Sequence, residues 1–243
     1  FYHATSVQYL KGSINKKGQV SGWLQRVALP SIVSSFKPLS DYASGFELNQ
    51  GFTNNPYDIE NFRLENVKAE AHLRIGWMRS VVHINSGFAN NSFVDELAFA
   101  AQKNPVDFQL ELIGKDRMIQ GKSDFPYDSK RMKKVLENTA KISDFKRKRP
   151  ENHGIGVAVH YSFYSYVATA VEVSVINGNL KVEQVWTTID CGLVLNKDNV
   201  INQLEGAAIF GISLALFGAK CIVEIKPIIS AVSDRSGLVG SYG

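Results

Sequence analysis

A change from strand to helix near residue 190 constrains this chain more than any other feature of its sequence. A β-rich segment ends at Asp190–Gly192, and within a few residues a long apolar helix with two glycines follows. From Val200 onward the apolar residues recur at i, i+4, i+7, i+8 and i+11, which is the spacing of one helical face. Asn196 or Asp198 is placed to cap the first turn.

The interior of this helix predicts packing against protein. Gly206 and Gly211 each cost a helix about 1 kcal/mol relative to alanine, so the glycines indicate either close approach of another backbone or ordinary tight core packing. Glu205 interrupts the apolar stripe, and the uninterrupted run after it falls short of the roughly 20 residues that cross a bilayer. A buried helix is therefore predicted, and not a membrane span.

Composition indicates a soluble globular chain with one large domain or two small ones. The sequence has 243 residues, of which 44% are hydrophobic and 21% are charged. Much of the net charge of +4 comes from the run Lys146–Arg149 before Pro150. The run contains no aromatic residue, so it is predicted to be a solvated linker, with no nucleic-acid partner.

The sequence lacks the residues that define several classes of catalytic site. Cys191 and Cys221 are the only cysteines, which excludes a cage of cysteines and leaves a single disulfide open. The five histidines show no HxxxH or HExxH spacing, so a protein-ligated zinc is not expected, and each is interpreted as a surface or satisfied core histidine. There is no Walker loop, GxGxxG or GxSxG, which argues against the common nucleotide-binding folds and serine hydrolases.

Periodicity predicts an α+β fold. A hairpin is expected over residues 5–29 around the turn NKKG, and a strand over residues 61–75. Helices are expected over 86–103, 105–112 and 128–145. After Pro150 three strands follow, the last two joined by a tight turn at Asn177-Gly178. Separate sheets and helices indicate α+β rather than a doubly wound fold, with a boundary near residue 150.

Three sequence blocks, in order, carry a family resemblance. They are PYDIENFRLENV, GWMRSVVHINSGFANNSFVDELAFAAQKNPVDFQLELIG, and GIGVAVHYSFYSYVATAVEVSV continued through DCGLVLN and QLEGAAIFG. From Ala4 to Phe217 the chain resembles the large, molybdopterin-binding subunit of the xanthine dehydrogenase and aldehyde oxidase superfamily. It looks most like the branch of bacterial isoquinoline 1-oxidoreductase beta subunits and aldehyde dehydrogenases.

The resemblance implies mixed sheets with packed helices, forming part of a two-half molybdenum cofactor-binding subunit. Residues 1–149 would be the C-terminal part of the first half, and residues 150–243 the incomplete start of the second. The implied cofactor is molybdopterin cytosine dinucleotide with its molybdenum. The implied reaction oxidises aldehydes or N-heterocycles with a water-derived oxygen.

The implied electron path leads out of this chain. Electrons would pass to iron–sulfur clusters on a small 2Fe-2S partner subunit, and a cytochrome c would be a further acceptor. Two cysteines are too few to ligate such a cluster, so the relay is expected on the partner. Relatives in this branch are often exported, which makes the periplasm the compartment by analogy.

One loop supplies the implied cofactor-binding residues. Arg79 matches the family's arginine against the cofactor, and its guanidinium fork suits anionic oxygens. Ser80, Val81 and Val82 match loop positions that face the cofactor or substrate in relatives. Glycine stands in relatives most often where this chain has Val82, which bears on close backbone approach. The neighbouring pair, Trp77 and Met78, is interpreted as core.

The junction at the start of the second half is interpreted as architecture. In this interpretation Gly192 forms a turn and Asn196 caps the helix. Gln203 and Glu205 are buried hydrogen-bonding groups, and Cys191 is not a catalytic thiol. Lys197 stands where the family usually has proline. The family-matching positions are Asp190, Cys191, Gly192, Asn196, Gln203 and Glu205.

Two family motifs have no counterpart in this sequence. They are the GxGE-type glutamate, which acts as general base in relatives, and the glutamine-bearing GQG. The resemblance ends at Phe217, and residues 219–243 do not continue it. No catalytic residue is therefore assigned, and this chain alone is not expected to turn over. The alternatives are a non-catalytic interaction module that binds a partner subunit, and a basic α+β binding domain.

Overall fold

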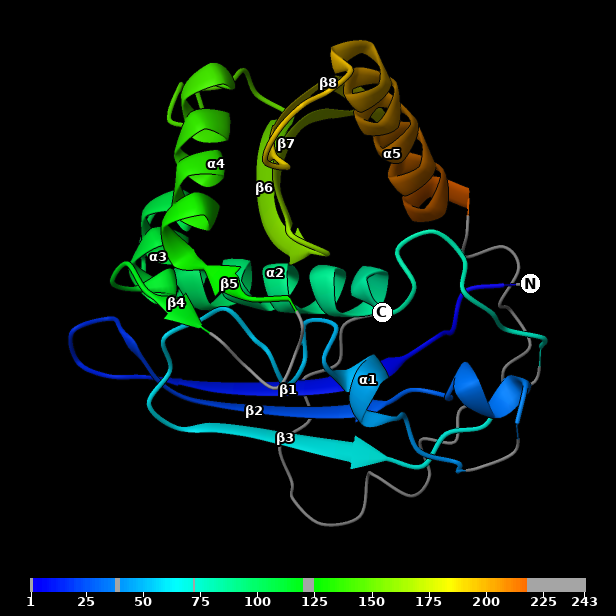
Figure 1. Ribbon diagram of the computed structural model, residues 1–243. Coiled ribbons are helices and arrows are strands. Elements are labelled where there is room, and N and C mark those ends of the chain that lie inside the picture. Colours follow the sequence, from blue (N-terminus) through cyan, green and yellow to red (C-terminus); the bar gives the residue numbers. More distant parts are fainter. Residues whose placement is uncertain (1, 38–39, 72, 120–124, 218–243) are drawn as a thin grey trace. The chain divides into compact units, whose positions relative to one another are not determined.

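The computed structural model describes residues 2–37, 40–71, 73–119 and 125–217, and confirms an α+β fold (Figure 1). The chain divides into two compact units, Phe1–Leu193 and Val194–Gly243. The first unit contains the strands and helices from β1 to β8, and the second contains α5. The segment after Phe217, where the family resemblance ends and where Cys221 stands, lies outside the described residues.

The first sheet combines a local hairpin with a distant strand. β1 (Val7–Ile14) and β2 (Val20–Ala28) form the predicted antiparallel hairpin. Asn15 closes its turn, because its side-chain oxygen accepts from the N–H groups of Lys17 at 2.9 Å and Gln19 at 3.1 Å. β3 (Phe62–Val67) pairs with β2 in parallel. A parallel partner requires a crossover connection, which residues 29–61 supply.

A buried carboxylate organises this connection, which contains the short helices η1 (Val33–Ser35) and α1 (Gly45–Leu48). Glu47 is 1% exposed and completes a capping box with Ser44. Its oxygens also accept from the backbone of Ile32 and the hydroxyl of Ser31. A buried charge needs such a full set of donors. The carboxylate thereby holds α1 against the start of the connection, and fixes the position of the residues that follow α1.

Three helices form the middle of the unit. They are α2 (His83–Ala100), α3 (Pro105–Ile113) and α4 (Ser129–Ile142). All three were predicted, although α2 begins at His83 rather than Ser86. Asn104 caps α3 and Asp128 caps α4 through their side-chain oxygens. The short strands β4 (Met118–Ile119) and β5 (Tyr127–Asp128) pair with each other between α3 and α4.

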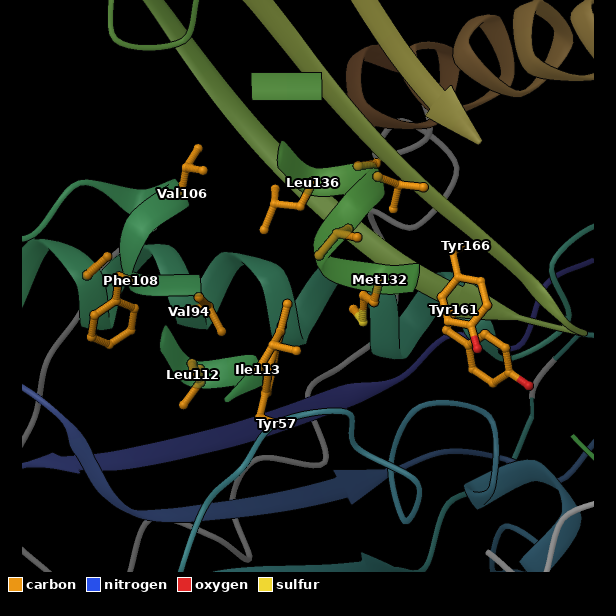
Figure 2. Close-up of a cluster of buried hydrophobic side chains, with 14 of the residues drawn as sticks. Tyr57, Val94, Val106, Phe108, Leu112, Ile113, Met132, Leu136, Tyr161 and Tyr166 are labelled. Carbon is orange, nitrogen blue, oxygen red and sulfur yellow. The ribbon is translucent and has the colours of Figure 1, made fainter. Parts of the chain in front are cut away.

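The C-terminal sheet is an antiparallel meander. β6 (His153–Ser162), β7 (Ser165–Ile176) and β8 (Asn179–Asp190) pair in chain order, as predicted, and α4 packs against them. Figure 1 shows α2 between this sheet and the first one. The main apolar core fills the space around the helices (Figure 2), with Tyr57, Val94, Phe108, Ile113, Met132, Leu136, Tyr161 and Tyr166 among its members.

The basic run before Pro150 is exposed at Lys146, Arg147 and Lys148, as predicted for a solvated segment, but its last residue, Arg149, is not. The side chain of Arg149 is only 7% exposed. It donates to the carbonyls of Ser143 and Phe145 at the end of α4, and its Nε lies 3.3 Å from the Glu172 carboxylate on β7. Cations suit helix C-termini, where carbonyls lack partners. Arg149 therefore ties the end of α4 to the sheet.

The second unit is a single described helix, α5 (Lys197–Phe217). Asn196 caps it as predicted, because its side chain accepts from the N–H of Asn199 at 3.0 Å. The predicted burial is wrong for the described chain, since no α5 residue is buried and Gln203 and Glu205 are exposed. A side chain added at Gly211 would meet no described atom within 4 Å. By length and composition alone α5 could cross a membrane.

The Arg149 contacts yield a stability test. Arg149→Met removes the donors but keeps the bulk, leaving α4 carbonyls and Glu172 without their buried partner. We expect the free energy of unfolding to fall by about 3 kcal/mol in urea titrations. Arg147→Met is the matched control. Arg147 also reaches Glu172, at 2.8 Å, but its side chain is 47% exposed, so the loss should stay below about 1 kcal/mol. Equal losses would contradict the role given to Arg149.

Candidate functional site

The loop predicted to meet the cofactor has a strained backbone. Ser80 and Val81 have φ angles of 76° and 48°, in the left-handed region. A β-branched residue rarely adopts such an angle, and each such residue costs on the order of 1–3 kcal/mol. Strain of this kind persists only where surrounding contacts hold it. The loop is thus a built feature and the strongest local anomaly at the start of α2.

Short hydrogen bonds hold the loop in this shape. The N–H of Val81 donates to Met78 O, and the N–H of His83 donates to Ser80 O, both at 2.8 Å. The N–H of Val82 donates to the side-chain oxygen of Gln50 at 3.1 Å. The loop backbone is thus fixed from within and from the connection after α1. The N–H groups of Val81 and Val82 are used inside the protein.

The loop side chains divide between solvent and core. Arg79 and Ser80 are exposed, which suits groups that would meet an anionic ligand. Val82 is fully buried in a second apolar cluster, which includes Leu29, Ile32 and Phe52, and Val81 packs against that cluster. Val82 therefore presents neither its side chain nor its N–H to a ligand, and Arg79, Ser80 and part of Val81 form the exposed part of the loop. Trp77 was predicted to be a core residue, and this prediction is wrong. Its side chain is 56% exposed and stacks on Phe36, with ring centroids 4.7 Å apart.

The structure adds Gln50 to this site. Its side-chain oxygen accepts from Val82, and its backbone carbonyl accepts from the hydroxyl of Ser86 at 2.6 Å. Its amide nitrogen, Nε2, is buried and has no hydrogen-bond partner among the described residues. A buried amide donor left without an acceptor costs about 1–3 kcal/mol, so this atom marks a place where an outside acceptor would fit. No local sequence pattern distinguishes Gln50 from other loop glutamines.

Amides on the buried face of α2 connect it to both sheets. Asn90 donates to Gly51 O at 2.8 Å and accepts from Gln25 on β2 at 3.0 Å. Asn91 bonds both backbone groups of Val159 on β6, donating to its carbonyl at 3.2 Å and accepting from its N–H at 3.0 Å. α2 therefore binds the sheets through directional bonds, and not through apolar packing alone.

Two histidines, His83 which is buried and His160 which is partly buried, meet beside the loop. His83 Nδ1 lies 2.9 Å from His160 Nε2, which joins the first residue of α2 to β6. Burial lowers the pKa of His83 to about 3, helped by the neighbouring ring, and lowers the pKa of His160 to about 4. Both rings are therefore neutral near pH 7 and can share one hydrogen bond. The prediction of satisfied core histidines is confirmed for this pair.

The turn between β6 and β7 carries a second anomaly. Phe163 and Tyr164 have φ angles of 46° and 67° at its two central positions. Left-handed backbone costs a residue other than glycine roughly 1–2 kcal/mol. Phe163 packs edge-on against His83, with ring centroids 5.2 Å apart, and both turn rings contact Phe125.

The Asp-Cys-Gly junction is scaffold, as predicted for Asp190 and Gly192. Both carboxylate oxygens of Asp190 accept from Arg131 on α4, at 2.8 and 2.6 Å. This pairing lowers the pKa of Asp190, as does the bond from the N–H of Gly192. Gly192 has a φ of 77° and forms the predicted turn. Within the described ranges, no group of three or more His, Cys, Asp or Glu could hold a metal ion.

These features define a class, an α+β domain that presents an arginine-bearing strained loop at the start of a buried helix. A family model described as a molybdopterin cofactor-binding domain matches residues 94–219, just over half of the chain. The chain therefore belongs to the molybdopterin cofactor-binding domain family. The match begins within α2 and includes α3, α4, the C-terminal sheet and α5, so Arg79–Val82 lies before it.

Curated relatives agree with this assignment. The chain is 30% identical over 166 residues to the beta chain of the isoquinoline 1-oxidoreductase of Brevundimonas diminuta, covering 66% of this chain and 20% of that protein. It is 28% identical over 183 residues to the membrane-bound aldehyde dehydrogenase (pyrroloquinoline-quinone) of Gluconacetobacter polyoxogenes, covering 71% and 24%. It is 25% identical over 235 residues to one of the subunits of the nicotinate dehydrogenase of Pseudomonas putida, covering 85% and 18%.

The chain thus spans about a fifth of the length of these relatives. Among solved structures, the aldehyde oxidoreductase of Desulfovibrio gigas is 14% identical and superposes with a TM-score of 0.46. That superposition covers 74% of this chain and 21% of the other. It is too weak to carry a functional argument.

The histidine pair predicts how stability depends on pH. Each ring has a folded pKa below the ordinary value of 6.5, so unfolding takes up protons. The unfolding free energy should therefore be highest above pH 6.5 and fall below it by about 1.4 kcal/mol per pH unit for each ring that stays neutral when folded. Urea titrations from pH 7.5 to 4.5 measure this. The variant His83→Asn/His160→Asn should show a shallower slope, and an unchanged slope would contradict the assignment.

Proposed function

We propose that this chain supplies part of the cofactor-binding surface of a molybdenum-dependent hydroxylase, with the loop Arg79–Val82 against the cofactor. The carrying observation is the strained loop, which presents Arg79 and Ser80 outward next to a buried amide donor without an acceptor among the described residues. Family membership supports the proposal. Strain stored at one exposed polar loop is typical of ligand-binding positions.

The residues present fit an anionic, oxygen-rich cofactor. The Arg79 guanidinium can donate paired, charge-assisted hydrogen bonds to phosphate oxygens. The Ser80 hydroxyl can donate beside it. The Gln50 amide nitrogen supplies a buried donor behind the loop. The start of α2 adds the positive end of a helix dipole, which favours negative charge.

In this proposal the protein holds the cofactor in position, and the cofactor carries out the reaction. When bound, molybdopterin with its molybdenum supplies oxygen transfer and accepts two electrons. Arg79 and Ser80 would hold its anionic groups, while Gln50 and Val82 keep the loop in shape. We assign the cytosine dinucleotide form because the resembling branch is bacterial. No general base is assigned, so activity belongs to the enzyme that contains this chain.

The proposed substrates are aldehydes or N-heterocycles. Curated relatives carry the names of both activities. Electrons would leave through a small 2Fe-2S subunit toward an acceptor such as cytochrome c. Two of the relatives are named as subunits, which supports a multi-subunit arrangement.

A second candidate function is a non-catalytic module that binds a partner subunit. α5 favours it, because this apolar helix has no buried residue in the described chain. The candidates differ in cofactor binding. An interaction module would bind its partner with no molybdenum present.

Arg79 gives the direct test of the proposal. Arg79→Ala should lower the molybdenum content of the purified complex severalfold, because a paired anion donor is lost, whereas Arg79→Lys should retain part of it. Molybdenum per protein, from elemental analysis, is the measurement. Arg63→Ala is the matched control, because Arg63 is an exposed β3 arginine, and it should leave the molybdenum content unchanged. No molybdenum in the wild-type complex would refute the proposal.

Gln50 allows a second test that spares the loop. Gln50→Glu keeps an oxygen that can accept from the N–H of Val82, but replaces the buried donor with an acceptor. We expect the thermal midpoint to fall, because the new carboxylate is buried with the N–H of Val82 as its one donor among the described residues, so molybdenum content is compared well below both midpoints. We also expect molybdenum content to fall, because the cofactor would face a second negative charge. Full retention of molybdenum would show that Nε2 does not serve the cofactor.

A further inference from the structure

The loop Arg79–Val82 is led by a turn of one particular type. The N–H of Val81 donates to Met78 O at 2.8 Å, so Arg79 and Ser80 are the central residues of a β-turn. Ser80 has a φ of 76°, and Arg79 is not among the described residues with a positive φ. A positive angle at the second central position alone identifies a type II turn.

Serine is an unfavourable residue at this place. The second central position of a type II turn prefers glycine, because Cβ crowds the backbone when φ is positive. A type I turn keeps the same bond between the end residues and suits most sequences. The two types differ by a flip of the central peptide, here the one between Arg79 and Ser80. Since the turn residues favour type I, a contact outside the turn must select type II.

His3 makes this contact. Its ring nitrogen Nε2 and the carbonyl oxygen of Arg79 are 2.5 Å apart, and this carbonyl belongs to the central peptide. A carbonyl oxygen can only accept, so Nε2 carries the hydrogen and donates. A flip of the peptide would turn the carbonyl away and break the bond. The bond therefore favours the type II form.

The backbone around this histidine is anchored on both sides of the turn. The segment Tyr2–Ala4 is called the strap below. Before the turn, the N–H of Gly76 donates to Tyr2 O at 3.1 Å. After the turn, Nδ2 of Asn85 on α2 donates to Ala4 O at 3.0 Å, and Ala4 is only 1% exposed. Because the strap is fixed at both ends, the histidine in its middle has a defined place.

A flip of the central peptide would also redirect a donor. In a trans peptide the C=O and the N–H point in opposite directions, so the N–H of Ser80 points away from His3 while Arg79 O accepts from it. Ser80 is exposed, and its N–H donates to no atom among the described residues. The type II form therefore presents a backbone donor beside the Arg79 side chain, and a flip would direct it toward the strap.

We propose that His3 is a positioning residue, which holds the turn in its type II form and thereby aims the N–H of Ser80 at the cofactor. The proposal rests on the proposed function, since it needs an anion at the loop. It gives the strap a role beyond stability, because loss of one bond would change the direction of a loop donor without unfolding the unit.

Nuclear magnetic resonance of the molybdenum-free chain tests the turn directly. In a type II turn ψ of the first central residue is about +120°, which places the Hα of Arg79 beside the N–H of Ser80. In a type I turn the two N–H groups approach each other instead. We expect a strong Overhauser contact from this Hα to the Ser80 N–H in the wild type, and its replacement by the contact between the two N–H groups in His3→Ala. His3→Gln should keep the wild-type contact, because its amide can still donate to Arg79 O.

Tyr2→Ala is the matched control, because it removes a neighbouring side chain that is 61% exposed and keeps the backbone of the strap. It should leave the wild-type contact unchanged. An unchanged contact in His3→Ala, or its loss in either His3→Gln or Tyr2→Ala, would overturn the proposal.

Molybdenum content separates this proposal from the proposed function. In the purified complex, His3→Ala should lower the molybdenum per protein about fivefold, the effect of one lost hydrogen bond, while His3→Gln and Tyr2→Ala retain it. Full retention in His3→Ala would overturn the role of His3 toward the cofactor. A wild-type complex without molybdenum would refute the proposed function, and the resonance measurement would still decide whether His3 selects the turn.

Discussion

The buried polar face of α2 is the constraint on which the rest of the first unit depends. Asn90 and Asn91 lie between two sheets, and each must find partners because an unpaired buried amide is costly. Asn91 meets this need by bonding both backbone groups of Val159, and Asn90 meets it on the other side through Gly51 and Gln25. Apolar packing would tolerate sliding of the helix, whereas these bonds fix one register. The start of α2, and with it the loop Arg79–Val82 that we propose meets the cofactor, has its place for this reason.

The same logic explains why the site has two unusual backbone segments. The loop at Ser80 and Val81 and the turn at Phe163 and Tyr164 both carry positive φ angles at residues other than glycine. The pair His83 and His160 lies close to both segments. Surroundings held by directional bonds can keep strained conformations that a softer core would release. These two segments therefore lie beside the same hydrogen-bonded pair of rings, whereas the other positive φ angles at residues besides glycine, at Gln102, Asp144, Asn152 and Asn177, lie elsewhere in the unit.

Sequence periodicity was sufficient for most of the fold. The N-terminal hairpin, α3, α4 and the C-terminal meander follow from local patterns of apolar residues and turn residues, and they were predicted. The predictions that failed concern residues whose contacts lie far along the chain. Arg149 was predicted to be solvated like the rest of its run, because nothing nearby in the sequence shows that its side chain meets Glu172. Gln50 has no local signature, since its importance comes from Val82, far along the chain. Burial of α5 was predicted from its apolar pattern, but its cover does not lie in the described residues.

The parallel pairing of β2 with β3 has a consequence for the order of folding. Both hairpins of the C-terminal meander close locally, whereas β3 can join β2 only after the whole intervening connection is ordered. Gln50 lies in that connection, and its contact with Val82 spans the two late-forming parts. We therefore expect the loop at Arg79 to be assembled among the last elements. It should also be among the first to open, so the proposed cofactor-binding loop can loosen while the meander and its core stay intact.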